Sequence, residues 1–281
     1  MIIASTVQDV RRAVKEWRRA GETIGLVPTM GYLHEGHASL VKAAKKDCSR
    51  TIVSVFVNPT QFGPNEDFES YPRNFEQDCA LLESLGVDLV FHPDPKELYE
   101  PDFCTWVETT ELTKNLCGKT RPTHFRGVCT VVSKLFHIAA PDKAYFGQKD
   151  AQQLAVITRM VRDLNFDIEI IGCPIVREGD GLAKSSRNKY LNDEERKAAL
   201  VLSLSLKKAR SLCEAGETDT ARILQTIRDV IAGEPLAKLD YAEAVDALSM
   251  KPVSQVTGSV LFAIAVYIGK TRLIDNFIIS R

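Results

Sequence analysis

Two histidines, His34 and His37, lie three residues apart in the stretch 28–37, where they could act together on a bound anion. An apolar run at 23–27 predicts a buried strand before this stretch, and the apolar spacing over 38–44 predicts a helix after it. The unpaired N–H groups at a helix start favour an anion such as phosphate. Gly31 and Gly36 let the backbone approach a ligand closely. We therefore expect the two imidazoles to converge on a triphosphate.

Other roles for the histidine pair stay open at this point. A single histidine is most often structural or solvated, although the pairing with two glycines after a strand weakens that expectation. His34, Glu35 and His37 also offer ligand atoms for a metal ion. In zinc proteases, however, the spacing is His-Glu-x-x-His on a continuous helix, and here the second histidine comes one residue early. An anion site is the favoured interpretation.

Asn58 and Gln61 follow a second buried segment. Residues 51–57 are almost all apolar or β-branched and do not alternate with polar residues, which predicts a strand covered on both faces. In open α/β sheets, ligands bind beyond the carboxyl ends of the strands. An amide side chain both donates and accepts hydrogen bonds. We expect this pair to bind a substrate that carries hydroxyl and carboxylate groups.

A third turn of this kind contains Gly147, Gln148, Lys149 and Asp150, after a predicted strand at 143–146. A lysine is a mobile point charge that suits a phosphate, and Gln153 lies one turn further along the next helix, where it could reach the same cleft. A solvated lysine is an equally weighted alternative, and Asp150 could simply be the helix N-cap.

The loop 176–188 combines two glycines with Lys184, Ser185, Ser186 and Arg187, a composition that suits phosphate. By itself this signal is weak, because such loops are often only linkers. Soon afterwards the predicted pattern changes from alternating strands and helices to helices followed by strands, so we place a hinge at this loop.

Helices and strands alternate as far as residue 175, which is the order of a parallel βαβ sheet. We predict strands at 23–27, 51–57, 87–91, 143–146 and 167–175, and helices at 7–20, 75–85, 124–139 and 150–164. In the looser region 92–122 we expect a strand at 104–108 and a short helix at 111–116. Two long helices at 192–214 and 218–231 then precede strands at 239–247, 260–268 and 273–278. The predicted fold is α/β: a Rossmann-like parallel sheet with helices on both faces in residues 1–175, and a smaller C-terminal α+β domain in residues 176–281.

The composition, 44% hydrophobic and 26% charged, is that of an ordinary globular protein, and 281 residues suffice for two domains. A formal net charge of −1 gives no reason to expect nucleic acid or an acidic membrane as a partner. The longest apolar run, 260–268, is about half a membrane span, and we expect no signal peptide. Seven scattered cysteines without a C-x-x-C pair argue against a metal finger or a disulfide scaffold, and they favour a reducing cytoplasm.

Four segments resemble the pantothenate synthetase family, in the same order and across nearly the whole chain. They are Pro-Thr-Met-Gly-Tyr-Leu-His-Glu-Gly-His from residue 28, Phe-Val-Asn-Pro-Thr-Gln-Phe from 56, Tyr-Phe-Gly-Gln-Lys-Asp-Ala-Gln-Gln-Leu from 145, and Asp-Gly-Leu-Ala-Lys-Ser-Ser-Arg-Asn from 180. The first motif marks only the wider His-x-Gly-His nucleotidyltransferase superfamily, and the second and third make the match specific. The resemblance implies condensation of (R)-pantoate with β-alanine through a pantoyl adenylate, with ATP converted to AMP and diphosphate.

Position by position, the resemblance also implies roles for the residues named above. His34 and His37 would bind the ATP phosphates with His37 as the catalytic acid, and Lys149 would steady the α-phosphate. Gln61 and Gln153 would hold pantoate, with Asn58 beside them. The implied ATP contacts are Met30, Gly31, Tyr32, Leu33, His34, Glu35, Gly36, His37, Gly147, Gln148, Lys149, Asp150, Val176, Lys184, Ser185, Ser186 and Arg187. The family often has Met where this chain has Lys184.

Magnesium would be held mainly by ATP oxygens, with Asp78 as a candidate carboxylate nearby. Arg121 and His124, at the start of the helix 124–139, are secondary candidates for an anion. The family resemblance implies a homodimer, for which this helix and the loose segment before it are candidate interfaces. We expect pantoate, β-alanine and ATP as partners, no nucleic acid or membrane, and a cytoplasmic location.

Two other functions fit parts of the pattern. A nucleotidyltransferase would attach AMP to a phosphate-bearing substrate and leave it there. A nucleotide-sensing module would bind ATP without chemistry.

Overall fold

The structure, a computed structural model, describes residues 1–64 and 66–281 and divides into two compact units. Unit 1 comprises Met1–Thr109, Arg121–Gln148 and Val156–Pro174, and unit 2 comprises Thr110–Thr120, Lys149–Ala155 and Ile175–Arg281. Two short segments of the region 1–175 therefore group with the C-terminal unit. The roles expected of residues 1–175, ATP and pantoate binding, and of residues 176–281, a lid, stay predictions.

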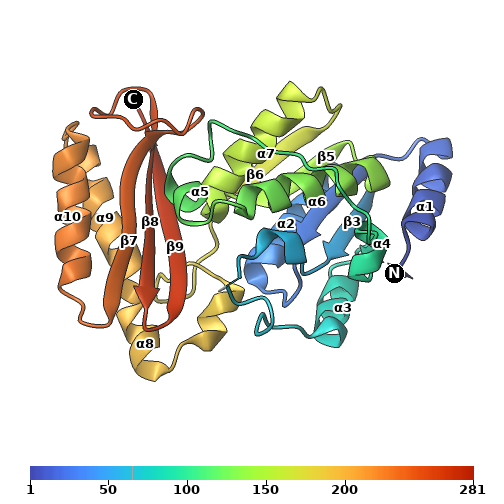
Figure 1. Ribbon diagram of the computed structural model, residues 1–281, viewed down its shortest axis with the longest axis horizontal. Helices are drawn as coiled ribbons and strands as arrows, with labels where there is room; N and C mark the ends of the chain where they lie inside the picture. The colour runs from blue at the N-terminus through green and yellow to red at the C-terminus, as the bar shows by residue number, and fades with distance from the viewer. Residues whose placement is uncertain (65) are drawn as a thin grey trace. The chain divides into compact units, whose positions relative to one another are not determined.

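Unit 1 is built on a parallel sheet (Figure 1). Its strands are β1 (Ile2–Ala4), β2 (Ile24–Thr29), β3 (Arg50–Val55), β4 (Leu89–Phe91), β5 (Lys143–Gly147) and β6 (Glu169–Cys173). The strand order is β1-β4-β3-β2-β5-β6, and every pair is parallel. The helices are α1 (Val7–Arg19), α2 (Glu35–Asp47), α3 (Phe75–Ser84), α4 (Pro95–Leu98) and α6 (His124–Ala139), with the short 3₁₀ helix η1 (Pro59–Gln61). Helix α7 (Ala151–Asp163) and the 3₁₀ turn η2 (Gln148–Asp150) contribute residues to both units.

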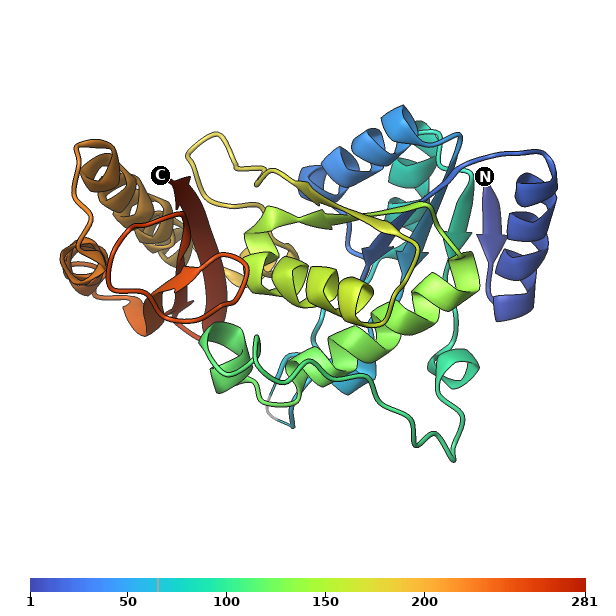
Figure 2. The ribbon, with the colours of Figure 1, turned by 90° about the horizontal axis from the view of Figure 1, so that it is seen from above.

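The sheet is covered on both faces, and apolar side chains of its central strands β2 and β3 are buried on both sides. Val27 and Val53 join the core under α2, whereas Leu26 and Ile52 point to the opposite face, since side chains alternate along a strand. All four are at most 1% exposed. Figure 2 shows α2 on one face of this sheet and α6 on the other. The arrangement confirms the predicted α/β fold.

The strand order reverses between β2 and β5. From β2 the chain adds β3 and β4 on one side, then returns and adds β5 and β6 on the other side. The carboxyl ends of β2 and β5 therefore flank a topological switch point, the place where open α/β sheets bind their ligands. The loop with the two histidines leaves β2 here, and the turn with Gly147 and Gln148 leaves β5.

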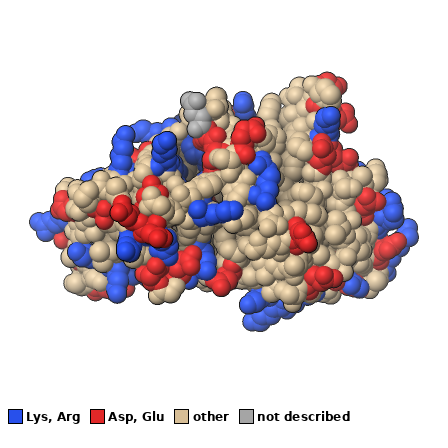
Figure 3. Space-filling model, turned by 90° about the horizontal axis from the view of Figure 1, so that it is seen from below, with Lys and Arg blue, Asp and Glu red and all other residues tan. Residues whose placement is uncertain are grey.

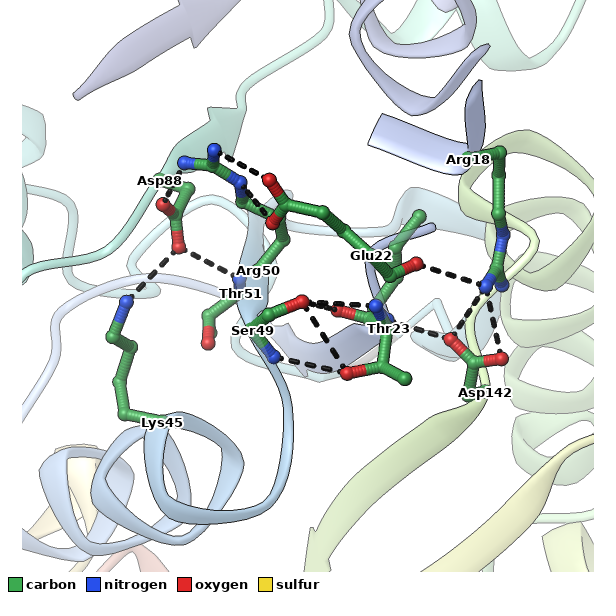
Figure 4. A network of polar contacts seen from close by, with 10 residues as sticks. Arg18, Glu22, Thr23, Lys45, Ser49, Arg50, Thr51, Asp88 and Asp142 are labelled. Atoms are coloured by element: carbon green, nitrogen blue, oxygen red, sulfur yellow. Dashed lines mark hydrogen bonds and ion pairs between the residues drawn. The ribbon is translucent and has the colours of Figure 1, made fainter. Parts of the chain in front are cut away.

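The opposite, amino-terminal edge of the sheet is held by charged groups (Figure 4). Asp88, just before β4, accepts a hydrogen bond from the Thr51 N–H (2.8 Å) and forms ion pairs with Arg50 (3.0 Å) and Lys45 (3.1 Å). Asp142, just before β5, accepts from the first N–H of β2 (2.6 Å). Burial raises the pKa of Asp88, but the hydrogen bonds outweigh it and hold that pKa below its ordinary value. These contacts join β4 to β3 and β5 to β2 at this edge.

Unit 2 contains a second, antiparallel sheet. Its strands are β7 (Ala237–Asp246), β8 (Ser259–Ile268) and β9 (Thr271–Ser280), in that order. The helices are α5 (Leu116–Thr120), α8 (Asp193–Ala198), α9 (Leu200–Glu214) and α10 (Thr220–Ala232), with the 3₁₀ helix η3 (Ser186–Tyr190). Side chains of α9 and α10 such as Leu206 and Ile227 share one core with Phe262 of β8. This is the predicted small α+β unit.

Four details of the predicted elements differ from the structure. Residues 104–108 are not a strand, and Trp106 is 41% exposed with its ring under the Arg126 guanidinium. The short helix is α5, which begins at Leu116, so the prediction of a helix at 111–116 is wrong. A turn at Ala199 divides the predicted helix 192–214 into α8 and α9. Strand β1 was not predicted at all.

Basic and acidic side chains are interspersed over the face drawn in Figure 3. In the part of the chain that the structure describes, no helix has both the length and the apolar character that a membrane crossing requires.

Candidate functional site

The loop between β2 and α2 is anchored by Asp78 of α3. This side chain is 2% exposed, and its two oxygens accept hydrogen bonds from the Tyr32 N–H (2.8 Å) and the Leu33 N–H (2.7 Å). Gly31 has a φ of +83°, and a Cβ there would lie 3.0 Å from both Asp78 Oδ2 and Val55 Cγ1. Burial raises the pKa of Asp78, and the two N–H donors act against that rise. Because both oxygens are used by the loop, the geometry favours a structural role for Asp78 over that of a magnesium ligand.

His34 and His37 lie against each other at the first turn of α2. Their ring centroids are 4.1 Å apart with an interplanar angle of 34°. His34 is the N-cap, and its Nδ1 accepts a hydrogen bond from the Gly36 N–H (3.1 Å), while His37 Nδ1 accepts from the His34 N–H (3.3 Å). A neutral imidazole that accepts at Nδ1 carries its proton on Nε2. Both rings therefore have an Nε2–H donor beside a helix N-terminus, an arrangement suited to phosphate oxygens.

Asn58 and Gln61 lie next to this loop, at the end of β3. Asn58 is 1% exposed and Gln61 is 7% exposed. Asn58 Nδ2 donates to Gln61 Oε1 (3.1 Å), and Gln61 Nε2 donates to Met30 Sδ (3.2 Å). The structure thus brings both amides to the β2 loop. The burial of Asn58 favours a role in holding Gln61 over direct contact with a ligand.

Arg121 and His124 hold the backbone of Gln61. His124 Nδ1 lies 3.0 Å from the Gln61 carbonyl oxygen, and Arg121 donates to the same oxygen at 3.4 Å. Arg121 also forms a two-pronged ion pair with Glu66 (2.6 and 2.5 Å). Burial raises the pKa of Glu66, but this ion pair outweighs it and holds that pKa below its ordinary value. The two residues predicted as anion candidates therefore support the position of Gln61.

Lys149 follows the last residue of β5 by two positions and belongs to unit 2. Its carbonyl oxygen accepts a hydrogen bond from Asn276 Nδ2 (2.8 Å), which fixes the backbone of the turn, and its ammonium lies 3.6 Å from Asp150. Gln153 lies four residues further, on α7 in the same unit. Gln148, still in unit 1, donates to the Gly172 carbonyl oxygen (3.4 Å).

The loop 176–188 is an ordered hairpin within unit 2. The Lys184 N–H donates to the Val176 carbonyl oxygen (2.9 Å), and the Lys184 ammonium pairs with Glu178 (3.2 Å). The Ser185 side chain caps η3 by accepting from the Arg187 N–H (3.3 Å). The residues from Lys184 to Arg187 therefore have a defined backbone rather than that of a loose linker.

The structure adds two residues that the sequence did not single out. Tyr99 donates its hydroxyl hydrogen to Asn58 Oδ1 (2.9 Å). Gly127 of α6 lies so close to η1 that a Cβ there would be 2.5 Å from the Thr60 carbonyl oxygen. An isolated glycine inside a helical pattern is a signal of close packing, so Gly127 could have been found from the sequence. No local pattern points to Tyr99.

Comparison with known proteins gives one consistent result. The family model described as pantoate-beta-alanine ligase matches residues 2–278. A protein of Clostridium novyi (strain NT) named pantothenate synthetase is 60% identical over 278 residues, covering 99% of this chain and 98% of the relative. A second protein of that name, from Clostridium acetobutylicum, is 58% identical over 277 residues and covers 99% of both chains.

Solved structures agree with this result. The crystal structure of pantothenate synthetase from Thermus thermophilus superimposes with a TM-score of 0.94 at 44% identity, covering 99% of both chains. A pantoate-beta-alanine ligase from Francisella tularensis, solved in complex with beta-gamma ATP and beta-alanine, has a TM-score of 0.79 at 37% identity and covers 99% of this chain and 97% of its own.

Proposed function

The chain belongs to the pantoate-beta-alanine ligase family, and from this premise we propose how its residues bring about the family's reaction. The chain is an ATP-dependent ligase that forms pantothenate from pantoate and β-alanine. A carboxylate is a poor acylating agent until a good leaving group is attached. In the proposed first step, a pantoate carboxylate oxygen bonds to the α-phosphorus of ATP and diphosphate leaves. The β-alanine amine then bonds to the acyl carbon, loses a proton, and AMP leaves.

The observation that carries the proposed ATP site is the pair of Nε2–H donors at the start of α2, beside the switch point of the sheet. We place the phosphates of ATP here, on His34, His37 and the N–H groups of the first turn. In this role the two imidazoles donate hydrogen bonds to oxygens that gain charge as diphosphate leaves. Met30, Gly31, Tyr32, Leu33, Glu35 and Gly36 supply the surrounding loop.

We propose that Lys149 stabilises the α-phosphate during the same step. Its backbone is fixed by Asn276, and a point charge at this position would offset the negative charge of the five-coordinate phosphorus. Gly147, Gln148 and Asp150 form the turn that presents it. Further ATP contacts are proposed for Val176, Lys184, Ser185, Ser186 and Arg187. The Lys184 ammonium forms an ion pair with Glu178 in this structure.

Pantoate is proposed to lie against Gln61 and Gln153, whose amides match its hydroxyl and carboxylate oxygens. Asn58 supports this site from behind. Among residues 1–64 and 66–281 no group of three His, Cys, Asp or Glu side chains is arranged for a metal ion. From family membership we propose that Mg²⁺ enters as part of the MgATP substrate, held mainly by phosphate oxygens.

We also propose a homodimer and a cytoplasmic location. The homodimer follows from family membership, with α6 and the segment 92–122 as candidate interfaces, and Trp106 in that segment is 41% exposed. All seven cysteines are free thiols, as expected in a reducing compartment. Sedimentation of the purified protein tests the first proposal.

Product analysis tests the reaction. With ATP, Mg²⁺, pantoate and β-alanine, we expect AMP and pantothenate. Omission of β-alanine should limit diphosphate release to one turnover and abolish AMP release. A nucleotidyltransferase would instead give a stable adenylylated product and no free AMP.

Two substitutions test the proposed ATP site. His37→Ala and Lys149→Ala should each slow single-turnover release of diphosphate by about 10²–10³, the scale for loss of one transition-state donor. Lys143→Ala is the matched control, because Lys143 lies at the other end of β5 and pairs with Glu169 (3.1 Å). Unchanged rates in the His37 and Lys149 variants would defeat the assignment.

A further inference from the structure

The amide of Asn58 has only one possible orientation. Its Oδ1 accepts from the Thr60 N–H (3.4 Å) and the Thr60 hydroxyl (3.0 Å), and its Nδ2 donates to the Gly127 carbonyl oxygen (3.2 Å). A backbone N–H only donates and a backbone carbonyl only accepts. Reversing the amide would therefore break contacts at both ends, in a site where the side chain is 1% exposed.

This orientation fixes that of Gln61. Asn58 Nδ2 also points a hydrogen at the Gln61 side chain (3.1 Å), so the atom that receives it must be the acceptor Oε1. The Nε2 of Gln61 then lies on the far side of its amide, 3.2 Å from the sulfur of Met30, which is a weak acceptor. Gln61 consequently presents N–H groups rather than a carbonyl at the loop edge of the sheet.

Tyr99 is the next member of this chain of hydrogen bonds. Its hydroxyl donates to Asn58 Oδ1 at 2.9 Å, and its ring lies edge-on to Phe103 with centroids 5.0 Å apart. Phe56 of the segment after β3 lies on the ring as well (6.5 Å). Burial raises the pKa of Tyr99, so its hydroxyl keeps its proton at neutral pH.

We propose that Tyr99 is a positioning residue for pantoate, acting through Asn58 to hold Gln61 as a hydrogen-bond donor. The substrate atom opposite Gln61 is then an acceptor oxygen of a hydroxyl or carboxylate group. This inference rests on the proposed role of Gln61 in holding pantoate. Tyr99 itself touches no substrate in this proposal.

Tyr99→Phe tests the inference most directly, because it keeps the ring and removes only the donor. We expect the KM for pantoate to rise about 3- to 10-fold, the value of one hydrogen bond, with the KM for ATP within about 2-fold of wild type. Asn58→Asp offers a second route that leaves Tyr99 intact. It places an acceptor against Gln61 Oε1, so the Gln61 amide must turn over, and the KM for pantoate should rise about 10- to 100-fold.

A double-mutant cycle separates positioning from a general structural role. If Tyr99 acts through Gln61, Tyr99→Phe should have little further effect on the KM for pantoate in a Gln61→Ala background. Tyr145→Phe is the matched control, because this buried hydroxyl bonds to Asp47 (3.1 Å) and not to Asn58. Its KM for pantoate should equal that of wild type.

The outcomes are distinguishable. Additive effects of Tyr99→Phe and Gln61→Ala, or an equal rise in the KM for ATP and for pantoate, would overturn the positioning role of Tyr99. An unchanged KM for pantoate in Gln61→Ala alone would instead overturn the proposed role of Gln61. Thermal unfolding of each variant identifies any change in the KM for pantoate that comes from destabilisation of the fold rather than from the site.

Discussion

Replacement of Asp78 by Asn would test whether the geometry of the β2 loop sets the rate of the ATP step. The carboxylate accepts from the N–H groups of Tyr32 and Leu33 at 2.8 and 2.7 Å. An asparagine has one acceptor oxygen, so one of these N–H groups would face an NH₂ group instead. Because His34 follows Leu33 directly, any turn of the loop that relieves this clash also moves the histidine pair.

The magnitude follows from the bonds lost. Losing a hydrogen bond to a charged acceptor, with a donor left unpaired in a buried place, costs about 1.5–3 kcal/mol. Every 1.4 kcal/mol corresponds to about tenfold in an equilibrium. We therefore expect the free energy of unfolding to fall by up to this amount and single-turnover diphosphate release to slow by about 10-fold or more.

Asp88→Asn is the matched control for this experiment. Asp88 is a partly buried carboxylate that also accepts from a backbone N–H, that of Thr51, but it lies at the amino-terminal edge of the sheet. Both variants should lose stability in urea unfolding, and only Asp78→Asn should slow diphosphate release from ATP and pantoate. The reasoning is refuted if Asp78→Asn is destabilised but reacts at the wild-type rate, or if Asp88→Asn is slowed equally.

Two further predictions concern packing and pH. Gly127→Ala should raise the KM for pantoate by about tenfold and destabilise the fold by about 1–3 kcal/mol, because the new methyl must push η1 away from α6. Steady-state kinetics check this prediction, with Gly233→Ala in unit 2 as the control that should leave the KM for pantoate unchanged. A wild-type KM for pantoate in Gly127→Ala would contradict the prediction. The pKa of Asp88 lies below its ordinary value of 3.8, so its stabilising effect is complete above that value and disappears as the pH falls through the lowered pKa. In urea unfolding, the free energy of unfolding of wild type should therefore exceed that of Asp88→Asn by about 1–3 kcal/mol at neutral pH, and this difference should disappear in acid below pH 3.8. A difference that persists in acid would show that the carboxylate charge is not its source.

Elements with a strong local pattern could be predicted from the sequence. The helix predicted at 124–139 is α6 (His124–Ala139), because its apolar positions recur at helical spacing over sixteen residues. Strand β1 could not be predicted, because Ile2 and Ile3 are 47% and 58% exposed and the strand exists only through pairing with β4, where Ile2 lies opposite Leu89. A partner so distant in sequence leaves no local signal.

The same distinction applies to the site. His34, His37 and Lys149 could be proposed as ligand-binding residues because each stands in a short glycine-containing turn between a strand and a helix. The role of Asp78 in holding Tyr32 depends on a contact between residues 46 positions apart, and that of Tyr99 on one 41 positions apart. Such contacts are set by the tertiary fold, so the amino-acid types alone suggested a different role for Asp78 and none for Tyr99.

The ion pairs around Asp88 and Asp142 lie at the opposite end of the strands from the loops that we propose bind ATP and pantoate. Additional contacts at this rim could therefore make the enzyme more heat-tolerant, provided that Asp88 and Asp142 are kept, since rigidity gained there need not restrict the loops assigned to substrate binding. Stability and turnover would then be selectable as separate traits in directed evolution of this enzyme.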